Sequence, residues 1–243
     1  MKPVIVTAAT PRELALLIAA LEKKERFLSA HRDAYRGEVD GRPVILAVTG
    51  IGKVNAAIAV TALLERCDTE LLITAGCAGA YHGSGLAVGD LAMATVEVAG
   101  DEGVLAPDGW HTLELIGIPA VERKGDSFFN RFPLTRWALD KAAFVAETSG
   151  ISLQKGAFVT VSTASGTLER GVELQRRFGG ICENMEGAAA AQAALLYGVD
   201  CMEVRGVSNL VEDRDLSRWD IQTAVDRAQE FILKFIAALC RTD

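Results

Sequence analysis

The chain has 243 residues, of which half are hydrophobic and 23% are charged, so one large domain can bury a substantial core. Its formal net charge of -7 argues against a nucleic-acid surface, which needs a clustered basic face. Charged residues interrupt each apolar run before it reaches membrane-spanning length, and the start of the chain lacks a secretion signal. We therefore expect a cytoplasmic protein that binds neither nucleic acid nor membrane.

The first fifth of the chain predicts a strand, a helix and a hairpin. Residues 3–9 form an apolar strand, and residues 12–28 carry apolar side chains at helical spacing. Residues 34–40 and 42–49 flank an Asp40-Gly41 turn, which is typical of a β-hairpin.

The remaining chain predicts alternating strands and helices, broken by a glycine-rich stretch at 76–89 and a polar irregular stretch at 100–133. The expected strands are residues 70–75, 90–99, 155–162 and 201–207, and the expected helices are 53–66, 135–148, 168–177, 185–197 and 219–240. Alternation combined with an early hairpin favours a mixed sheet. Since no linker or repeat divides the chain, we predict one domain over residues 1–243, an α/β protein built as an α/β/α sandwich with a central mixed sheet.

Cysteine and histidine usage gives no sign of a metal site. The five cysteines contain no CxxC pair and are read as reduced, mostly buried small residues. The three histidines lack metal-ligand spacing. No metal and no cofactor are expected.

Two segments in the second half carry the groups suited to ligand binding. Glu183-Asn184-Met185-Glu186 opens the alanine-rich helix and can offer an acid and a thioether to a flat, polar ligand. Arg205-Gly206-Val207-Ser208-Asn209 closes a strand and can offer a guanidinium, a hydroxyl and a carboxamide. The glycines of Gly50-Ile51-Gly52-Lys53 fit neither a P-loop nor a dinucleotide fingerprint, and taken alone predict a simple strand-to-helix turn.

Together with Glu13 and Gly76-Cys77-Ala78-Gly79, these motifs resemble, in order and over nearly the whole chain, the purine nucleoside phosphorylase and methylthioadenosine nucleosidase superfamily. The resemblance implies a nucleoside phosphorylase-like fold, a purine nucleoside and water as reactants, and a homo-oligomer. Within the superfamily the chain most resembles the futalosine hydrolases, through residues 211–221 and a loop at 100–110.

The resemblance assigns roles to several acids. Glu13 matches the general base that activates water, although a glutamate in the first turn of a helix also has a structural explanation. Glu186 and Met185 match the pair that binds ribose, with the carboxylate accepting from the 2'- and 3'-hydroxyls. Asn184 stands where methylthioadenosine nucleosidase has another acid, and Arg205 is expected beside the attacking water or the glutamate.

The same resemblance bears on the reaction type. In relatives the loop matched by Gly76 and Cys77 faces the ribose and the nucleophile, and phosphorylases place an arginine three residues before its serine. Here the matching positions are Thr74 and Cys77, neither of which can hold phosphate by charge, so hydrolysis is favoured. Thr163 and Ala164 match the segment whose backbone contacts the purine.

Asn209 indicates which purine is bound. Adenine-specific nucleosidases carry aspartate at the matching position, whereas a carboxamide donates to a 6-oxo group and accepts from N7–H. This pattern suits hypoxanthine or guanine, with Ser208 supporting the amide, although asparagine is also a common turn residue.

The implied function is hydrolysis of the N-glycosidic bond of futalosine, which releases hypoxanthine and dehypoxanthine futalosine in menaquinone biosynthesis. Three alternatives stay open: another purine nucleosidase of the inosine or methylthioadenosine/adenosylhomocysteine type, a phosphorylase, and a non-catalytic nucleoside-binding protein. Aromatic and basic residues that could hold the carboxyphenyl end of futalosine, but that helix packing explains equally well, are Phe128, Phe129, Arg131, Phe132 and Arg136.

Overall fold

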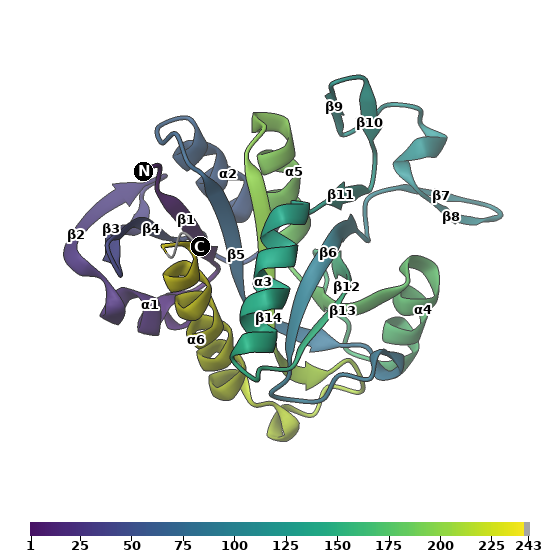
Figure 1. Cartoon of the computed structure of the whole chain (residues 1–243). Coiled ribbons are helices and arrows are strands. Elements are labelled where there is room, and N and C mark those ends of the chain that lie inside the picture. Colours follow the sequence, from purple (N-terminus) through teal and green to yellow (C-terminus); the bar gives the residue numbers. More distant parts are fainter. Residues whose placement is uncertain (241–243) are drawn as a thin grey trace.

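A ten-stranded mixed sheet forms the centre of the molecule in the computed structural model, which describes residues 1–240 (Figure 1). The last three residues of the predicted 1–243 domain lie outside the described residues. The predicted α/β class with a central mixed sheet is confirmed. Each helix within residues 1–240 is too short or too polar to cross a membrane.

The N-terminal half of the sheet is built from parallel strands extended by a meander. Strand β1 (Val4–Ala8) lies between β4 (Arg42–Val48) and β5 (Leu71–Ala80) and is parallel to both. Strands β3 (Arg32–Val39) and β2 (Glu22–Ser29) continue from β4 in antiparallel order to the edge. All five residues of β1 are buried, as is typical of a central strand in the parallel part of a sheet.

Five strands close into a ring in the other half of the sheet. Strand β14 (Asp200–Leu210) pairs in parallel with β5 and in antiparallel with β6 (Leu91–Ala99). Strands β12 (Leu153–Thr160) and β13 (Gly180–Asn184) complete the circuit from β6 back to β5. The ring therefore gives β14 a hydrogen-bonded neighbour on both sides.

Helices cover both faces of β14. On one face lies α6 (Ile221–Leu239), and Gly206 is glycine because a Cβ there would overlap the backbone carbonyl of Ala224. On the other face the first residue of α5 (Gly187–Tyr197) abuts the side chain of Glu203. Alternate residues of a strand point to opposite faces, so Glu203 and Arg205 both point to the face that α5 covers.

The other helices pack around these two. Figure 1 shows α1 (Ala15–Ala20) and α3 (Arg136–Thr148) beside α6, and α2 (Lys53–Leu64) beside α5. Helix α4 (Leu168–Phe178) packs near β13. The stretch predicted as irregular contains short strands: β7 (Val104–Ala106), β8 (Gly109–His111), β9 (Val121–Arg123), β10 (Asp126–Phe128) and β11 (Arg131–Pro133).

The predicted helix over residues 12–28 is wrong in its second half. A 3-10 turn, η1 (Pro11–Leu14), leads into α1, and the chain then turns into β2. The charged run at the start of β2 is compatible with a helix surface, but it lies on an exposed edge strand, where Glu25 forms an ion pair with Arg36 of β3.

Two motifs predicted in other settings belong to strands. Gly76 to Gly79, expected in a loop, lies inside β5, which runs on to Ala80. Glu183 and Asn184, expected to open a helix, end β13, and α5 begins only at Gly187. Both corrections place functional side chains on hydrogen-bonded backbone, which positions them more firmly than a loop would.

Candidate active site

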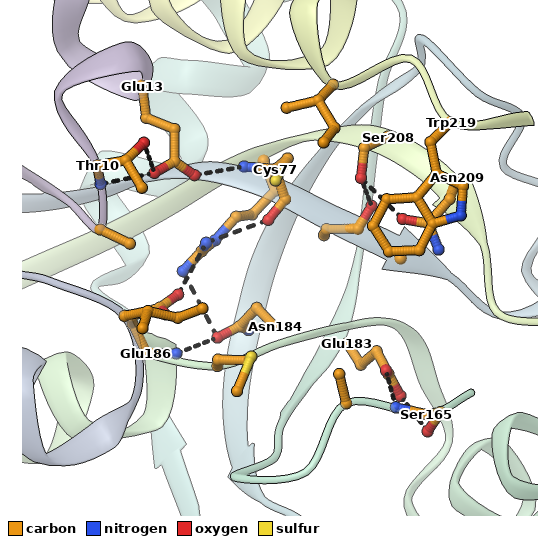
Figure 2. A pocket seen from close by; sticks show the side chains of 18 of the residues that line it. Thr10, Glu13, Cys77, Ser165, Glu183, Asn184, Glu186, Ser208, Asn209 and Trp219 are labelled. Carbon is orange, nitrogen blue, oxygen red and sulfur yellow. Dashed lines mark hydrogen bonds and ion pairs between the residues drawn. The ribbon is translucent and has the colours of Figure 1, made fainter. Parts of the chain in front are cut away.

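A cavity of about 340 Å³ opens at the end of the ring of strands (Figure 2). Residues from η1, β5, β13 and β14 form its wall, together with residues from the loops that follow β1, β4, β12, β13 and β14. From the predicted site the wall includes Glu13, Cys77, Ala164, Asn184, Met185, Glu186, Arg205, Ser208 and Asn209.

Glu13 reaches the cavity from the short 3-10 helix η1. Its Oε2 accepts hydrogen bonds from the backbone N–H of Thr10 at 2.9 Å and from the Thr10 hydroxyl at 2.8 Å. Its Oε1 accepts from the backbone N–H of Cys77 at 3.2 Å. The residue is 6% exposed, so these donors hold a buried carboxylate at a fixed place beside β5.

Gly76 allows the carboxylate of Glu13 and the guanidinium of Arg205 to approach the same point of β5. A Cβ at this position would lie 2.5 Å from Glu13 Oε1 and 2.8 Å from Arg205 Nη1. Its φ of +148° is also a conformation that L side chains rarely adopt. Glycine is therefore required here by both space and backbone geometry.

Arg205 is buried at the centre of a group of acids. Its Nε donates to Glu203 Oε1 at 2.7 Å, and its Nη1 donates to the Cys77 carbonyl at 3.2 Å and to Glu186 Oε2 at 3.3 Å. Burial opposes its charge, but the nearby carboxylates of Glu203, Glu186 and Glu13 outweigh burial and raise the pKa of Arg205. Arg205 is thus a fixed cation that cannot serve as a proton donor.

The residues expected to bind ribose lie at the junction of β13 and α5. Glu186 Oε1 accepts from the backbone N–H of Gly52 at 2.9 Å, which brings the glycine loop before α2 into the site. Asn184 Oδ1 accepts from the backbone N–H groups of Glu186 at 2.9 Å and Gly187 at 2.7 Å. Asn184 thus satisfies donors at the start of α5 and holds the turn that presents Met185 and Glu186 to the cavity.

Two further acids lie behind the cavity without contacting it. Glu97 is fully buried and accepts from the Thr160 hydroxyl at 2.6 Å and from the Asn184 amide at 2.7 Å. Burial and the charge of Glu203 raise the pKa of Glu97 well above its ordinary value. A Cβ added at Gly187 would overlap a carboxylate oxygen of each acid, so the two side chains lie close together behind the start of α5.

The opposite end of the cavity holds the carboxamide of Asn209. Its Oδ1 accepts from the Ser208 hydroxyl at 2.8 Å, and its Nδ2 donates to the Leu210 carbonyl at 3.0 Å. Figure 2 shows the Trp219 ring beside Asn209, and the Arg214 guanidinium lies 4.7 Å from the centre of that ring. The amide is therefore held by its neighbours while an aromatic surface adjoins it.

Across the cavity from Asn209, the carboxylate of Glu183 is held by three donors. Ser165 donates through its backbone N–H at 2.8 Å and its hydroxyl at 2.7 Å, and the Tyr81 hydroxyl donates at 3.3 Å. Burial raises the pKa of Glu183, whereas these hydrogen bonds oppose the rise. Figure 2 shows Glu183 and Ser165 on the wall opposite Asn209.

Two other residues of the predicted site differ in whether they line the cavity. Thr163 is exposed and does not line the cavity, whereas its neighbours Ala164 and Ser165 do. Cys77 lines it, but burial and the charge of Glu13 raise the pKa of its thiol to about 11, so it is a neutral wall residue.

The residues considered for the far end of the substrate are also away from the cavity. Phe132 is buried in β11, and Arg131 donates to the Phe178 carbonyl. Arg136 forms an exposed ion pair with Asp140, while Phe128 and Phe129 line a separate hollow. Within residues 1–240, no group of three or more histidine, cysteine or acidic side chains is arranged to hold a metal ion.

Several residues of the site, among them Thr10, Glu203 and Ser165, were not predicted from the sequence. The spacing of Thr10 and Glu13 matches a capping box, so the anchoring of Glu13 was available from the sequence. Glu203 and Ser165 gave no such signal, because their contacts depend on pairing between distant strands and loops.

The arrangement recurs in known proteins. Residues 3–241 match the family described as the phosphorylase superfamily. The chain belongs to the phosphorylase superfamily.

Similar members of this superfamily are hydrolases of nucleosides. Futalosine hydrolase of Thermus thermophilus is 35% identical over 207 residues, covering 84% of this chain and 85% of that protein. The 5'-methylthioadenosine/S-adenosylhomocysteine nucleosidase of Bacillus subtilis is 30% identical, covering 95% and 96%.

A solved structure of a nucleosidase has the same fold as this chain. The 5'-methylthioadenosine/S-adenosylhomocysteine nucleosidase of Neisseria meningitidis, in complex with methylthio-immucillin-A, has a TM-score of 0.85 at 25% identity. The match covers 98% of this chain and 99% of that one. The chain described here, as a member of this superfamily, is a nucleosidase, which is an enzyme that hydrolyses N-glycosyl bonds.

Proposed function

We propose that this nucleosidase is a futalosine hydrolase that releases hypoxanthine and dehypoxanthine futalosine in menaquinone biosynthesis. The observation that carries the proposal is the carboxamide of Asn209 at one end of the cavity, held through its oxygen by Ser208. An amide can donate to O6 and accept from N7–H of a departing 6-oxopurine. Two relatives named futalosine hydrolase, at 35% and 34% identity, support the same substrate.

The proposed mechanism gives four polar side chains of the cavity one role each. Glu186, with Met185 beside it, holds the sugar hydroxyls while positive charge develops on the ribose. As the C1'–N9 bond breaks and water adds to C1', Glu13 takes the proton from the water, and the departing purine takes up a proton at N7 from solvent, which lets Asn209 accept from N7–H. Arg205 positions Glu186 and balances part of its negative charge. Groups fixed in advance by hydrogen bonds supply most of the expected acceleration.

The electrostatics of the cavity favour water over phosphate as the nucleophile. Glu13 and Glu186 line the cavity, and Glu203 adds a third carboxylate to the group around Arg205. Beside β5, where these carboxylates gather, the guanidinium of Arg205 is already hydrogen-bonded to Glu203 and Glu186. A phosphate dianion there would face more negative than positive charge, whereas neutral water avoids this repulsion.

A methylthioadenosine/adenosylhomocysteine nucleosidase is the second candidate. The relative from Bacillus subtilis with this name covers 95% of the chain, a larger share than the futalosine hydrolase relative from Thermus thermophilus. The two candidates differ in the base they release, because adenine presents an amino group where hypoxanthine presents an oxygen.

The deciding experiment follows base release by chromatography. Wild-type enzyme is incubated with futalosine, aminofutalosine, inosine and methylthioadenosine, each with and without phosphate. We expect hypoxanthine from futalosine at the same rate in both buffers, with methylthioadenosine cleaved at least about 100-fold less efficiently. Dependence on phosphate would indicate a phosphorylase, and faster adenine release would indicate the second candidate.

We also propose that the enzyme acts in the cytoplasm as a homo-oligomer. Apolar side chains of Ile51, Val54 and Ile58 are exposed around the start of α2, and Ile51 itself lines the cavity. A second copy covering this surface would bury it and reach the rim of the site.

A further inference from the structure

One oxygen of the Glu203 carboxylate, Oε2, is buried and has no role in the mechanism above. The residue is 1% exposed, and its other oxygen, Oε1, accepts from Arg205 Nε at 2.7 Å. Within residues 1–240, Oε2 has no hydrogen-bond donor among the backbone and side-chain groups that always carry a proton. A buried carboxylate oxygen without a donor is costly, so a donor is expected beside it.

The carboxyl group of Glu97 is placed to supply that donor. A Cβ added at Gly187 would overlap Glu97 Oε1 and Glu203 Oε2 at once, so these two oxygens flank the same point. The hydroxyl of Thr74, which is beside Glu203 in strand register, is itself buried without a partner and does not reach Oε2. Two carboxyl oxygens meet favourably only when one of them carries a proton.

The surroundings of the two acids indicate which of them holds the proton. Glu203 is the member that forms an ion pair, with Arg205. Glu97 is 0% exposed, and its own hydrogen bonds come from a neutral hydroxyl and a neutral amide. Burial, the charge of Glu203 and a hydrogen bond between the two carboxyl groups raise the pKa of Glu97 and outweigh the effects that oppose them. Burial also raises the pKa of the nearby thiols of Cys182 and Cys201, so these thiols add no charge.

We propose that Glu97 is an un-ionised carboxylic acid and donates a hydrogen bond to Glu203 Oε2. The acid pair then positions Arg205, whose Nη1 contacts Glu186 Oε2 at 3.3 Å. A second route runs through Asn184, whose amide donates to Glu97 and whose Oδ1 accepts from the Glu186 backbone N–H at 2.9 Å. Both routes end at Glu186, so the proposal rests on its proposed role in holding the sugar and not on which base is released.

Infrared spectroscopy of the ligand-free enzyme tests the protonation state directly. At pH 7 an ordinary glutamate, with a pKa of about 4.3, is ionised and gives no C=O band of a carboxylic acid. We expect one such band in the wild type that is absent from Glu97→Gln, which keeps the shape of the side chain. Glu169→Gln, which replaces an exposed acid of α4, is the matched control and keeps the band. Identical acid bands in the wild type and Glu97→Gln would overturn the proposal, because Glu203 would then have a water molecule or another group as its donor.

Kinetics with the nucleoside that the wild type cleaves fastest test the positioning role. Glu97→Met fills a similar volume but can neither donate to Glu203 nor accept from Asn184, so we expect kcat to fall by about 10-fold to 100-fold. Glu97→Gln still offers a donor to Glu203, and its kcat should stay within about fivefold of wild type. Affinity for the released base should change by less than about threefold in both variants, because Asn209 lies at the other end of the cavity.

A third variant keeps the test decisive where Glu97→Met folds poorly. Glu97→Asp keeps the acid but draws it back by one methylene, and we expect its kcat to lie about fivefold or more below that of Glu97→Gln. Wild-type kcat in every variant that circular dichroism shows to be folded would overturn the positioning role. An equal loss of base affinity would also overturn it, since that result indicates a general loosening of the cavity. Failure of the wild type to hydrolyse futalosine would reject the proposed function alone, because the spectra and another nucleoside still test the acid pair.

Discussion

The carboxylate of Glu13 is held by donors from two segments that are far apart in sequence, Thr10 and Cys77. This anchoring fixes the oxygen relative to Arg205, because both side chains meet beside Gly76. The position suits a base that must receive a proton from a water molecule above β5.

Replacement of Glu13 by Gln tests this assignment. We expect kcat for the cleaved nucleoside to fall by about 100-fold to 10,000-fold, since an amide cannot accept the proton of water. Hypoxanthine affinity should stay within about threefold of wild type, because Glu13 and Asn209 occupy different ends of the cavity. Steady-state kinetics and calorimetry measure the two effects, and unchanged turnover would contradict the assignment.

Among the residues of the cavity, those that belong to a recognisable motif could be predicted from the sequence. Glu13, Glu186, Arg205 and Asn209 all reach one cavity, as their motifs indicated. Thr163 does not line the cavity although Ala164 and Ser165 do, so its expected backbone contact with the purine stays a prediction. Residues such as Glu203 could not be predicted from the sequence, because their role depends on which elements pack against β14.

At the scale of elements, the acid pair of Glu97 and Glu203 connects β6, β14 and the start of α5. The raised pKa of Glu97 means that the folded state binds its proton more tightly than the unfolded chain does. This contribution favours folding fully below pH about 4.5 and is lost as pH rises through the folded-state pKa.

Glu97→Gln removes this titration and tests the coupling. We expect the free energy of unfolding of the variant to fall less than that of the wild type between pH 5 and pH 8. Urea unfolding at several pH values measures the difference in slope, with Glu169→Gln, whose side chain is exposed, as the control. Parallel curves for the variant and the wild type would show that Glu97 is ionised throughout.

Most elements, but not their pairing, could be predicted from the sequence. Apolar periodicity located α2, α3, α4 and α6 to within a few residues. The charged strand β2 was predicted as helix because its exposed edge lacks an apolar alternation. Ring closure through β13 was missed because Gly180–Asn184 is short and polar at its end, and long-range pairing stabilises it.

At the scale of the whole molecule, the exposed apolar surface around α2 is the feature that bears on assembly. Val54 is 74% exposed and Ile58 is 54% exposed, one helical turn apart on the same face. Leaving both in water is unfavourable, which supports the proposed homo-oligomer.

The double variant Val54→Asp/Ile58→Asp tests this surface. We expect light scattering after size-exclusion chromatography to give an oligomer for the wild type and a monomer near 25.9 kDa for the variant. Val172→Asp, an exposed apolar position on α4, serves as the control and should keep the wild-type mass. A monomeric wild type, or a variant of unchanged mass, would contradict the proposal.

The ring of strands has a consequence for how a nucleoside enters. The backbone of β14 is paired with β5 at both Arg205 and Asn209, and with β6 at Arg205, so it cannot shift there without breaking strand pairing. The connection between β14 and α6, from which Arg214 and Trp219 line the cavity, lies outside the sheet. We therefore expect substitutions in this connection to alter entry and departure of ligands before they alter bond cleavage.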